Sequence, residues 1–202
     1  MLRWNDYFQS LNNIIHSLEI TMKNGLRLDT EDGLSLFCDK VMAVKKNSRV
    51  AFFTGNGASA SMASHFSADL AKNLRLKTMV FTDLSLMTAM ANDEGYEKIY
   101  SDPLSIWGGA GDILLTISSS GSSANIVEVL QYAEEKNLFS VTFSAMDRNN
   151  VSRRMGDLNF YLPADDYGSA EVLHAVILHY LTDCLVEQFK GESLAPSDCS
   201  NW

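Results

Sequence analysis

Two segments of the chain combine histidine with a carboxylate at spacings that fit a helix. His65 and Asp69 lie four positions apart in "SHFSADL", which puts their side chains about 40° apart on one helical face. Glu171 and His179 lie eight positions apart in "EVLHAVILH", about 80° apart around a helix. Two imidazoles and two carboxylates form a ligand set suited to a metal ion, and a carboxylate with a histidine can also transfer protons as base and acid. The alternatives are an ordinary surface pair for His65 and Asp69, and ordinary core or surface positions for each histidine.

Two further segments are rich in glycine and small hydroxylated residues, "TGNGASAS" at 54–61 and "SSSGSSAN" at 118–125. In the second, serines surround Gly121, which permits a tight turn with inward-pointing backbone N–H groups. A helix that starts there adds free amides and a positive dipole end, so a phosphate can be held without lysine. The alternative is a simple turn and helix cap. Neither segment has the spacing of a P-loop or of a GxGxxG dinucleotide loop, which argues against a nucleotide-binding protein. The loop serines are Ser118, Ser119, Ser120, Ser122 and Ser123.

The elements that must position these residues alternate between strand and helix from residue 49 onward. Short apolar strands followed by helices predict an open parallel five-stranded sheet covered by helices on both faces, a flavodoxin-like three-layer sandwich. Two extra helices precede it. We expect one domain, 1–202, made of N-terminal helices (1–46), an α/β core (47–190) and a tail (191–202). The predicted strands are 49–55, 77–82, 112–118, 138–144 and 157–163; the predicted helices are 4–24, 31–46, 58–73, 84–93, 123–137 and 169–189.

The composition narrows the class of ligand. The chain has 202 residues and a formal net charge of -9, whereas proteins that hold nucleic acid usually carry a basic face. A small phosphorylated ligand, held locally, is therefore favoured over a polymer, and we expect no nucleic-acid partner. The N-terminus has no apolar run of the signal-peptide type and no segment approaches ~20 uninterrupted apolar residues, so we expect a cytoplasmic protein with no membrane partner. Cys38, Cys184 and Cys199 match no metal or redox spacing.

Four segments together resemble one family. In order they are "GNGASASMASHFSADL", "MTAMANDEGYEKIY", "GDILLTISSSGSSANIVEVLQYAEEKN" and "SAEVLHAVILHYLTD". They resemble the bacterial phosphoheptose isomerases, which are sedoheptulose 7-phosphate isomerases of the SIS (sugar isomerase) fold, and the likeness extends over residues 5 to 190 with near-constant spacing.

This resemblance implies a homotetramer whose active sites lie between subunits. It also implies a catalytic carboxylate at Asp69 and a catalytic histidine at His179. Many members hold zinc, which here implies the ligands His65, Asp69, Glu171 and His179. The implied sugar- and phosphate-binding residues are Asn56, Ser59, Asp93, Ser118, Ser119, Ser120 and Ser123.

The chain departs from the family at the chemical centre. Asp69 stands where the family has glutamate, and Glu171 stands where it has glutamine. The family's glycine-rich turn after the fourth strand is replaced by "SAMDRNNVS" (144–152), and its basic residue soon after the carboxylate is displaced, with Asn73 near that place and Arg75 following. The phosphate cradle is kept, so the departures bear on the reaction and on the identity of the sugar.

We therefore expect an aldose–ketose isomerase of a phosphorylated sugar, most simply sedoheptulose 7-phosphate to a manno-heptose 7-phosphate through an enediol(ate). Asp69 would be the base and His179 the acid. The competing interpretation is a non-catalytic SIS-domain protein that binds a phosphosugar or a protein such as a replication initiator. Because such relatives typically lose the carboxylate or the histidine, and this chain has both, the enzyme is favoured. The same site residues are expected whether the heptose is used for lipopolysaccharide, for capsule or for a secreted metabolite.

Overall fold

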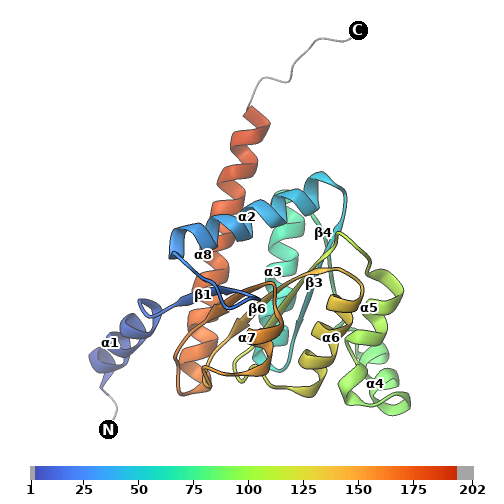
Figure 1. Ribbon diagram of the computed structural model, residues 1–202, viewed down its shortest axis with the longest axis horizontal. Coiled ribbons are helices and arrows are strands. Elements are labelled where there is room, and N and C mark those ends of the chain that lie inside the picture. Colours follow the sequence, from blue (N-terminus) through green and yellow to red (C-terminus); the bar gives the residue numbers. More distant parts are fainter. Residues whose placement is uncertain (1–2, 195–202) are drawn as a thin grey trace.

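A mixed sheet of seven strands forms the centre of the computed structural model, which describes residues 3–194 (Figure 1). The strand order is β2-β1-β7-β6-β5-β3-β4. Five of the strands are parallel to one another, as predicted, and lie within the predicted ranges. They are β3 (Val50–Gly55), β4 (Lys77–Val80), β5 (Ile113–Ser118), β6 (Phe139–Ser144) and β7 (Leu158–Tyr161).

The N-terminal part differs from the prediction. The first helix, α1 (Trp4–Ile15), ends well before residue 24, and the chain then forms a hairpin of β1 (Glu19–Met22) and β2 (Arg27–Leu28). β1 pairs antiparallel with β7, so the sheet has seven strands rather than five and the N-terminal part is not wholly helical. Leu18, Ile20 and Met22 alternate with the period of a strand, and Leu18 and Met22 also fit a helical stripe, which is why the sequence pattern was ambiguous.

Helices cover both faces of the sheet. Neighbouring residues of β3 show the two cores: Phe53 packs in the core that also contains side chains of α2, α3 and α8, and Phe52 packs in the core with α5 and α6. Successive residues of a strand point to opposite faces of the sheet, so an apolar strand such as β3 contributes side chains to both cores. The remaining helices are α2 (Thr30–Lys46), α3 (Ala58–Leu74), α4 (Leu84–Asp93), the 3-10 turn η1 (Tyr96–Lys98), α5 (Ser101–Trp107), α6 (Ala124–Glu135), α7 (Val151–Met155) and α8 (Tyr167–Leu194).

α8 is the longest helix and extends beyond the sandwich (Figure 1). By length and composition it could cross a membrane, but half of its apolar stretch is buried inside the protein, and it contacts α2 and α3. This burial is typical of the core helix of a folded domain. The helix continues past residue 190, so the predicted tail begins later than expected; residues 195–202, including Cys199, lie outside the described part of the chain.

Candidate active site

The serine-rich loop forms one wall of a pocket at the carboxyl ends of β3 and β5, where ligands bind in open α/β sheets. The hollow measures about 160 Å³. All six residues predicted to cradle a phosphate on these two loops line it together. The lining is Asn56, Ser59, Ile117, Ser118, Ser119, Ser120, Ser123, Tyr167 and Glu171.

The loop's shape leaves donors free for an anion. Gly121 has φ +60°, and a Cβ there would lie 2.1 Å from Asn150 Oδ1, so this turn requires glycine. Its N–H donates to the backbone carbonyl of Ser118 at 2.9 Å, which closes the turn. Ser123 is the N-cap residue of α6, but its side chain makes no capping hydrogen bond. The Ser123 hydroxyl and the N-terminal amides of α6 are therefore available to a phosphate.

A buried amide pair fixes Asn56 at the pocket. Asn56 Nδ2 donates to Asn125 Oδ1 at 2.9 Å, and Asn125 Nδ2 donates back to Asn56 Oδ1 at 2.8 Å. Tyr96 Oη also donates to Asn56 Oδ1, at 3.3 Å, and the buried Tyr100 hydroxyl donates to the carbonyl of Gly55. Burial raises the pKa of Tyr100 to about 12, so this donor keeps its proton at neutral pH. Three positioning residues, Asn125, Tyr96 and Tyr100, were not identified from the sequence, although each lies inside a segment that carries the resemblance.

Asp93 lies outside this group. It ends α4, is exposed, and its Oδ1 accepts a hydrogen bond from Asn92 Nδ2 at 2.7 Å. It does not line the pocket, although Tyr96, in the turn that follows it, reaches Asn56. The assignment of Asp93 to the sugar stays a prediction.

A second group of chemical side chains lies between α3 and α8. His65, Asp69 and His179 each offer one ligand atom, and these atoms all lie within 4.8 Å of one another. His65 Nε2 and Asp69 Oδ2 are 3.3 Å apart, and Asp69 is 28% exposed. Phe66 packs edge-on against His179, with ring centroids 4.8 Å apart. The predicted convergence of the two helices is thus observed for three of the four residues.

The side chains of this trio are of the types that hold a divalent metal ion. Neighbouring ligands on a tetrahedral zinc ion, at about 2.1 Å from the metal, lie about 3.4 Å from each other. The His65–Asp69 distance of 3.3 Å is close to that edge, and the three ligand atoms as a group lie within 4.8 Å of one another. Two imidazoles and one carboxylate would leave a fourth position open on a tetrahedral ion.

Glu171 does not join the trio within one chain. It lines the serine pocket instead. Eight positions along a helix correspond to a rise of about 12 Å, so Glu171 and His179 share a side of α8 at different heights. The sequence spacing correctly predicted that the two residues share one side of α8. They are separated along the helix axis. The assignment of Glu171 as a fourth ligand stays a prediction.

Comparisons with known proteins place the chain in a family. Residues 6–143 match the family model of the SIS domain. The phosphoheptose isomerase of Helicobacter pylori is 31% identical over 141 residues, covering 67% of this chain and 73% of the relative. The solved phosphoheptose isomerase of Neisseria gonorrhoeae superposes with a TM-score of 0.72 at 27% identity, covering 76% of this chain and 86% of that one.

A solved phosphoheptose isomerase of Francisella tularensis superposes with a TM-score of 0.78 at 22% identity, covering 91% of this chain and 96% of that one. At that identity the likeness bears on the fold alone, and its coverage of 91% of this chain goes beyond the range 6–143 that the family model matches. Fold, serine pocket and sequence relatives lead to one assignment: the chain belongs to the phosphoheptose isomerase family of SIS-domain proteins.

Proposed function

We propose that this protein is a cytoplasmic isomerase that converts sedoheptulose 7-phosphate to a manno-heptose 7-phosphate. The observation that carries the proposal is the pocket of serine hydroxyls and Asn56 at the carboxyl end of the sheet, combined with a His–Asp–His trio on the helices that follow. The curated relatives at about 30% identity are named phosphoheptose isomerases.

Phosphate binding in this pocket depends on neutral donors. Within the lining there is no lysine or arginine, and the chain as a whole has a formal charge of -9. Serine hydroxyls, backbone N–H groups and the N-terminus of α6 supply the hydrogen bonds instead. Because Glu171 adds a carboxylate to the same lining, it must face a hydroxyl or a cation and not the phosphate.

We further propose that the complete site forms between copies in a homotetramer. Val172, Val176 and Tyr180 are 44%, 49% and 48% exposed, and they follow one another at the spacing of a single helical stripe, beside His179. A second copy packed on this stripe would bring its Glu171 and serine pocket toward the trio of the first. Leu11 is buried, and Leu18 and Met22 pack on the chain's own core, so these N-terminal side chains contribute little to such a contact.

The chemistry follows from the side chains in the trio. Asp69 removes a proton from the carbon beside the carbonyl of the ketose. Protonated Asp69 then returns a proton to the neighbouring carbon of the enediolate. His179 exchanges protons with the two oxygens, so that charge does not accumulate on either. Zinc held by His65, Asp69 and His179 would orient the sugar hydroxyls and polarise the carbonyl.

Replacing Asp69 with asparagine tests this function. Asp69→Asn keeps the size of the side chain and removes its basicity, and general-base catalysis is worth about 10²–10⁴-fold. We expect kcat to fall by at least ~10²-fold, with sugar-phosphate affinity in calorimetry unchanged. Glu187→Gln, which removes an exposed charge from α8 away from the trio, is the matched control and should retain activity.

Two results would overturn the proposal. If the wild-type protein binds sedoheptulose 7-phosphate without converting it, the competing interpretation of a non-catalytic SIS protein is correct. If Asp69→Asn retains full activity, Asp69 is not the base. A monomer in light scattering at micromolar concentration would contradict the shared site.

A further inference from the structure

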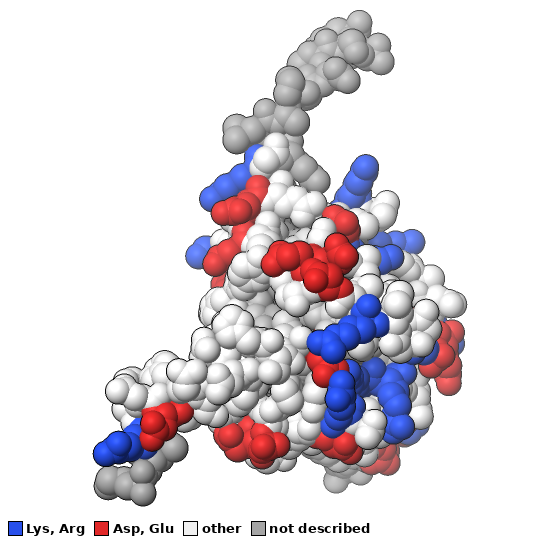
Figure 2. Space-filling model, turned by 60° about the vertical axis from the view of Figure 1, so that its left-hand side comes forward, with Lys and Arg blue, Asp and Glu red and all other residues white. Residues whose placement is uncertain are grey.

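A second hollow, of about 220 Å³, lies between the β1–β2 hairpin and the segment 148–154. It is separate from the serine pocket, with which it shares no lining residue. Figure 2 shows Lys and Arg side chains gathered right of centre on one face of this acidic protein. The lining of the hollow is basic: Thr21, Met22, Lys23, Gly25, Arg148, Asn149, Arg153 and Arg154.

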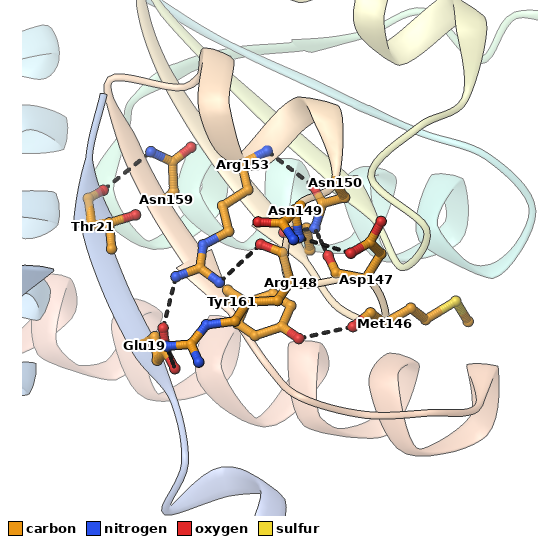
Figure 3. Close-up of polar contacts among 11 residues, drawn as sticks. Glu19, Thr21, Met146, Asp147, Arg148, Asn149, Asn150, Arg153, Asn159 and Tyr161 are labelled. Atoms are coloured by element: carbon orange, nitrogen blue, oxygen red, sulfur yellow. Dashed lines mark hydrogen bonds and ion pairs between the residues drawn. The ribbon is translucent and has the colours of Figure 1, made fainter. Parts of the chain in front are cut away.

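Arg153 is a fixed part of the wall (Figure 3). Its guanidinium donates to Glu19 at 2.7 Å and to the carbonyl of Arg148 at 3.2 Å, and it stacks over Tyr161 at 4.2 Å. Its side chain is 11% exposed. Burial opposes ionisation of Glu19, but the hydrogen bond and charge of Arg153, with those of Arg148, lower the pKa of Glu19. The carboxylate is therefore ionised at neutral pH.

The wall keeps unneutralised positive charge. Arg148 and Arg153 share the single carboxylate of Glu19, each at 2.7 Å. Arg154 is exposed and has no hydrogen-bond or ion-pair partner among residues 3–194. Lys23 is paired with Glu134 at 2.6 Å, so these two charges cancel.

Asp147 is the other carboxylate next to the wall. Its Oδ1 accepts a hydrogen bond from the backbone N–H of Asn149 at 2.8 Å, within its own loop. Even with Asp147 counted, three arginines face two carboxylates, and a positive charge remains.

We propose that this hollow is a second anion site, which binds the phosphate group of a small ligand through Arg148 and Arg154. Arg148 is 65% exposed and uses one terminal nitrogen for Glu19, so the rest of its guanidinium is open to the hollow. The planar fork of guanidinium donors matches phosphate geometry. Arg153 is held in place by its own partners, so its positive charge stays in the wall of the hollow. The size of the hollow suits a phosphate group and excludes most of a large polymer.

The position of the site links it to the first pocket. The segment that carries the arginines also supports the serine loop: the N–H of Ser152 donates to the carbonyl of Gly121 at 2.8 Å, and the N–H of Ala145 donates to that of Ser119 at 3.0 Å. A ligand held by Arg148 and Arg154 therefore binds to the short segment on which the serine loop rests.

Phosphate titration in a background with a weakened first site tests the proposal. In Ser119→Ala/Ser120→Ala protein, inorganic phosphate is titrated and followed by ³¹P NMR. We expect binding to persist, and Arg148→Gln/Arg154→Gln added to this background to raise the Kd at least ~10-fold, since two charged donors are lost. Arg154→Gln alone breaks no ion pair and replaces the combined variant if that one unfolds. It should also raise the Kd for phosphate.

A charge-matched control separates a site from general electrostatics. Lys46→Gln/Lys136→Gln removes two positive charges from exposed positions, the last residue of α2 and the C-cap of α6. Neither residue lines the hollow, and the Kd should stay within about twofold because surface charges outside a site are screened by salt. Equal weakening by both double variants would overturn the proposal. The proposal would also be overturned if phosphate binding to the serine-loop variant did not change when Arg148 and Arg154 are replaced. A DNA oligomer that binds through these arginines more tightly than phosphate does would overturn it as well.

Discussion

Lengthening Asp69 by one methylene probes how closely the trio is fitted to its present side chain. In Asp69→Glu the carboxylate moves outward by about 1.5 Å, one C–C bond. Asp69 Oδ2 now lies 3.3 Å from His65 Nε2, the separation of neighbouring ligands on a tetrahedral zinc ion. A glutamate in the same rotamer would overshoot into His65, and one that turns aside would leave the ligand geometry. Either way the reacting oxygen is misplaced by about 1 Å, which can cost ~10²-fold in rate.

The expected loss in kcat/KM is therefore about 100-fold, or ~2.7 kcal/mol of transition-state stabilisation. It should be measured by steady-state turnover of sedoheptulose 7-phosphate, together with zinc retention in competition with a chelator. Phosphate affinity should not change, because the serine pocket lies two turns of α8 away. Turnover that rises in Asp69→Glu would refute the reasoning and show a decayed site that the family's glutamate repairs.

Three further outcomes follow from the structure. Ser119→Ala/Ser120→Ala should weaken sugar-phosphate binding at least ~10-fold in calorimetry with the fold retained, since hydroxyl donors to an anion are lost; unchanged affinity would contradict the cradle. Asn125→Ala should raise KM at least ~5-fold by freeing Asn56, with thermal unfolding used to separate this effect from a loss of stability of about 1–3 kcal/mol for the unpaired amide; an unchanged KM would deny Asn125 a positioning role. Burial lowers the pKa of His174 from 6.5 to about 4. Protons therefore bind the unfolded chain first, and the free energy of unfolding should drop by up to about 3 kcal/mol as the pH falls from 6.5 to 4 in urea titrations. A His174→Leu variant should lack this slope, and a wild-type slope in that variant would assign the effect to other groups.

Local sequence patterns were enough for the parallel core of the fold. Strands such as β3 are apolar throughout because both faces of a parallel sheet are covered. Four of the five predicted strands were followed by a predicted helix, whereas the short α7 after β6 was not predicted. The hairpin at the N-terminus was missed because Leu18 and Met22 fit both periods. What decides between them is pairing with β7, more than 130 positions away, which no local pattern contains.

The candidate site was predictable where one loop or one helical turn sets the geometry. The serines around Gly121 come together as expected because they follow a single strand. Glu171 does not join the trio within one chain, because a shared rotation around α8 still leaves Glu171 and His179 separated by the rise along its axis; its role as a ligand stays a prediction. Asn125 and Tyr96 were missed because their role depends on contacts with Asn56, on a different strand-to-helix junction.

The proton transfer itself is the most direct test of the proposed function. Sedoheptulose 7-phosphate is incubated with the wild-type protein in deuterated water and followed by ¹H NMR. If Asp69 acts through an enediolate, an aldoheptose 7-phosphate forms and carries solvent deuterium on the carbon next to its carbonyl, and Asp69→Asn abolishes both signals. A sugar phosphate that binds but neither converts nor exchanges, or turnover that is unchanged in Asp69→Asn, would contradict the account.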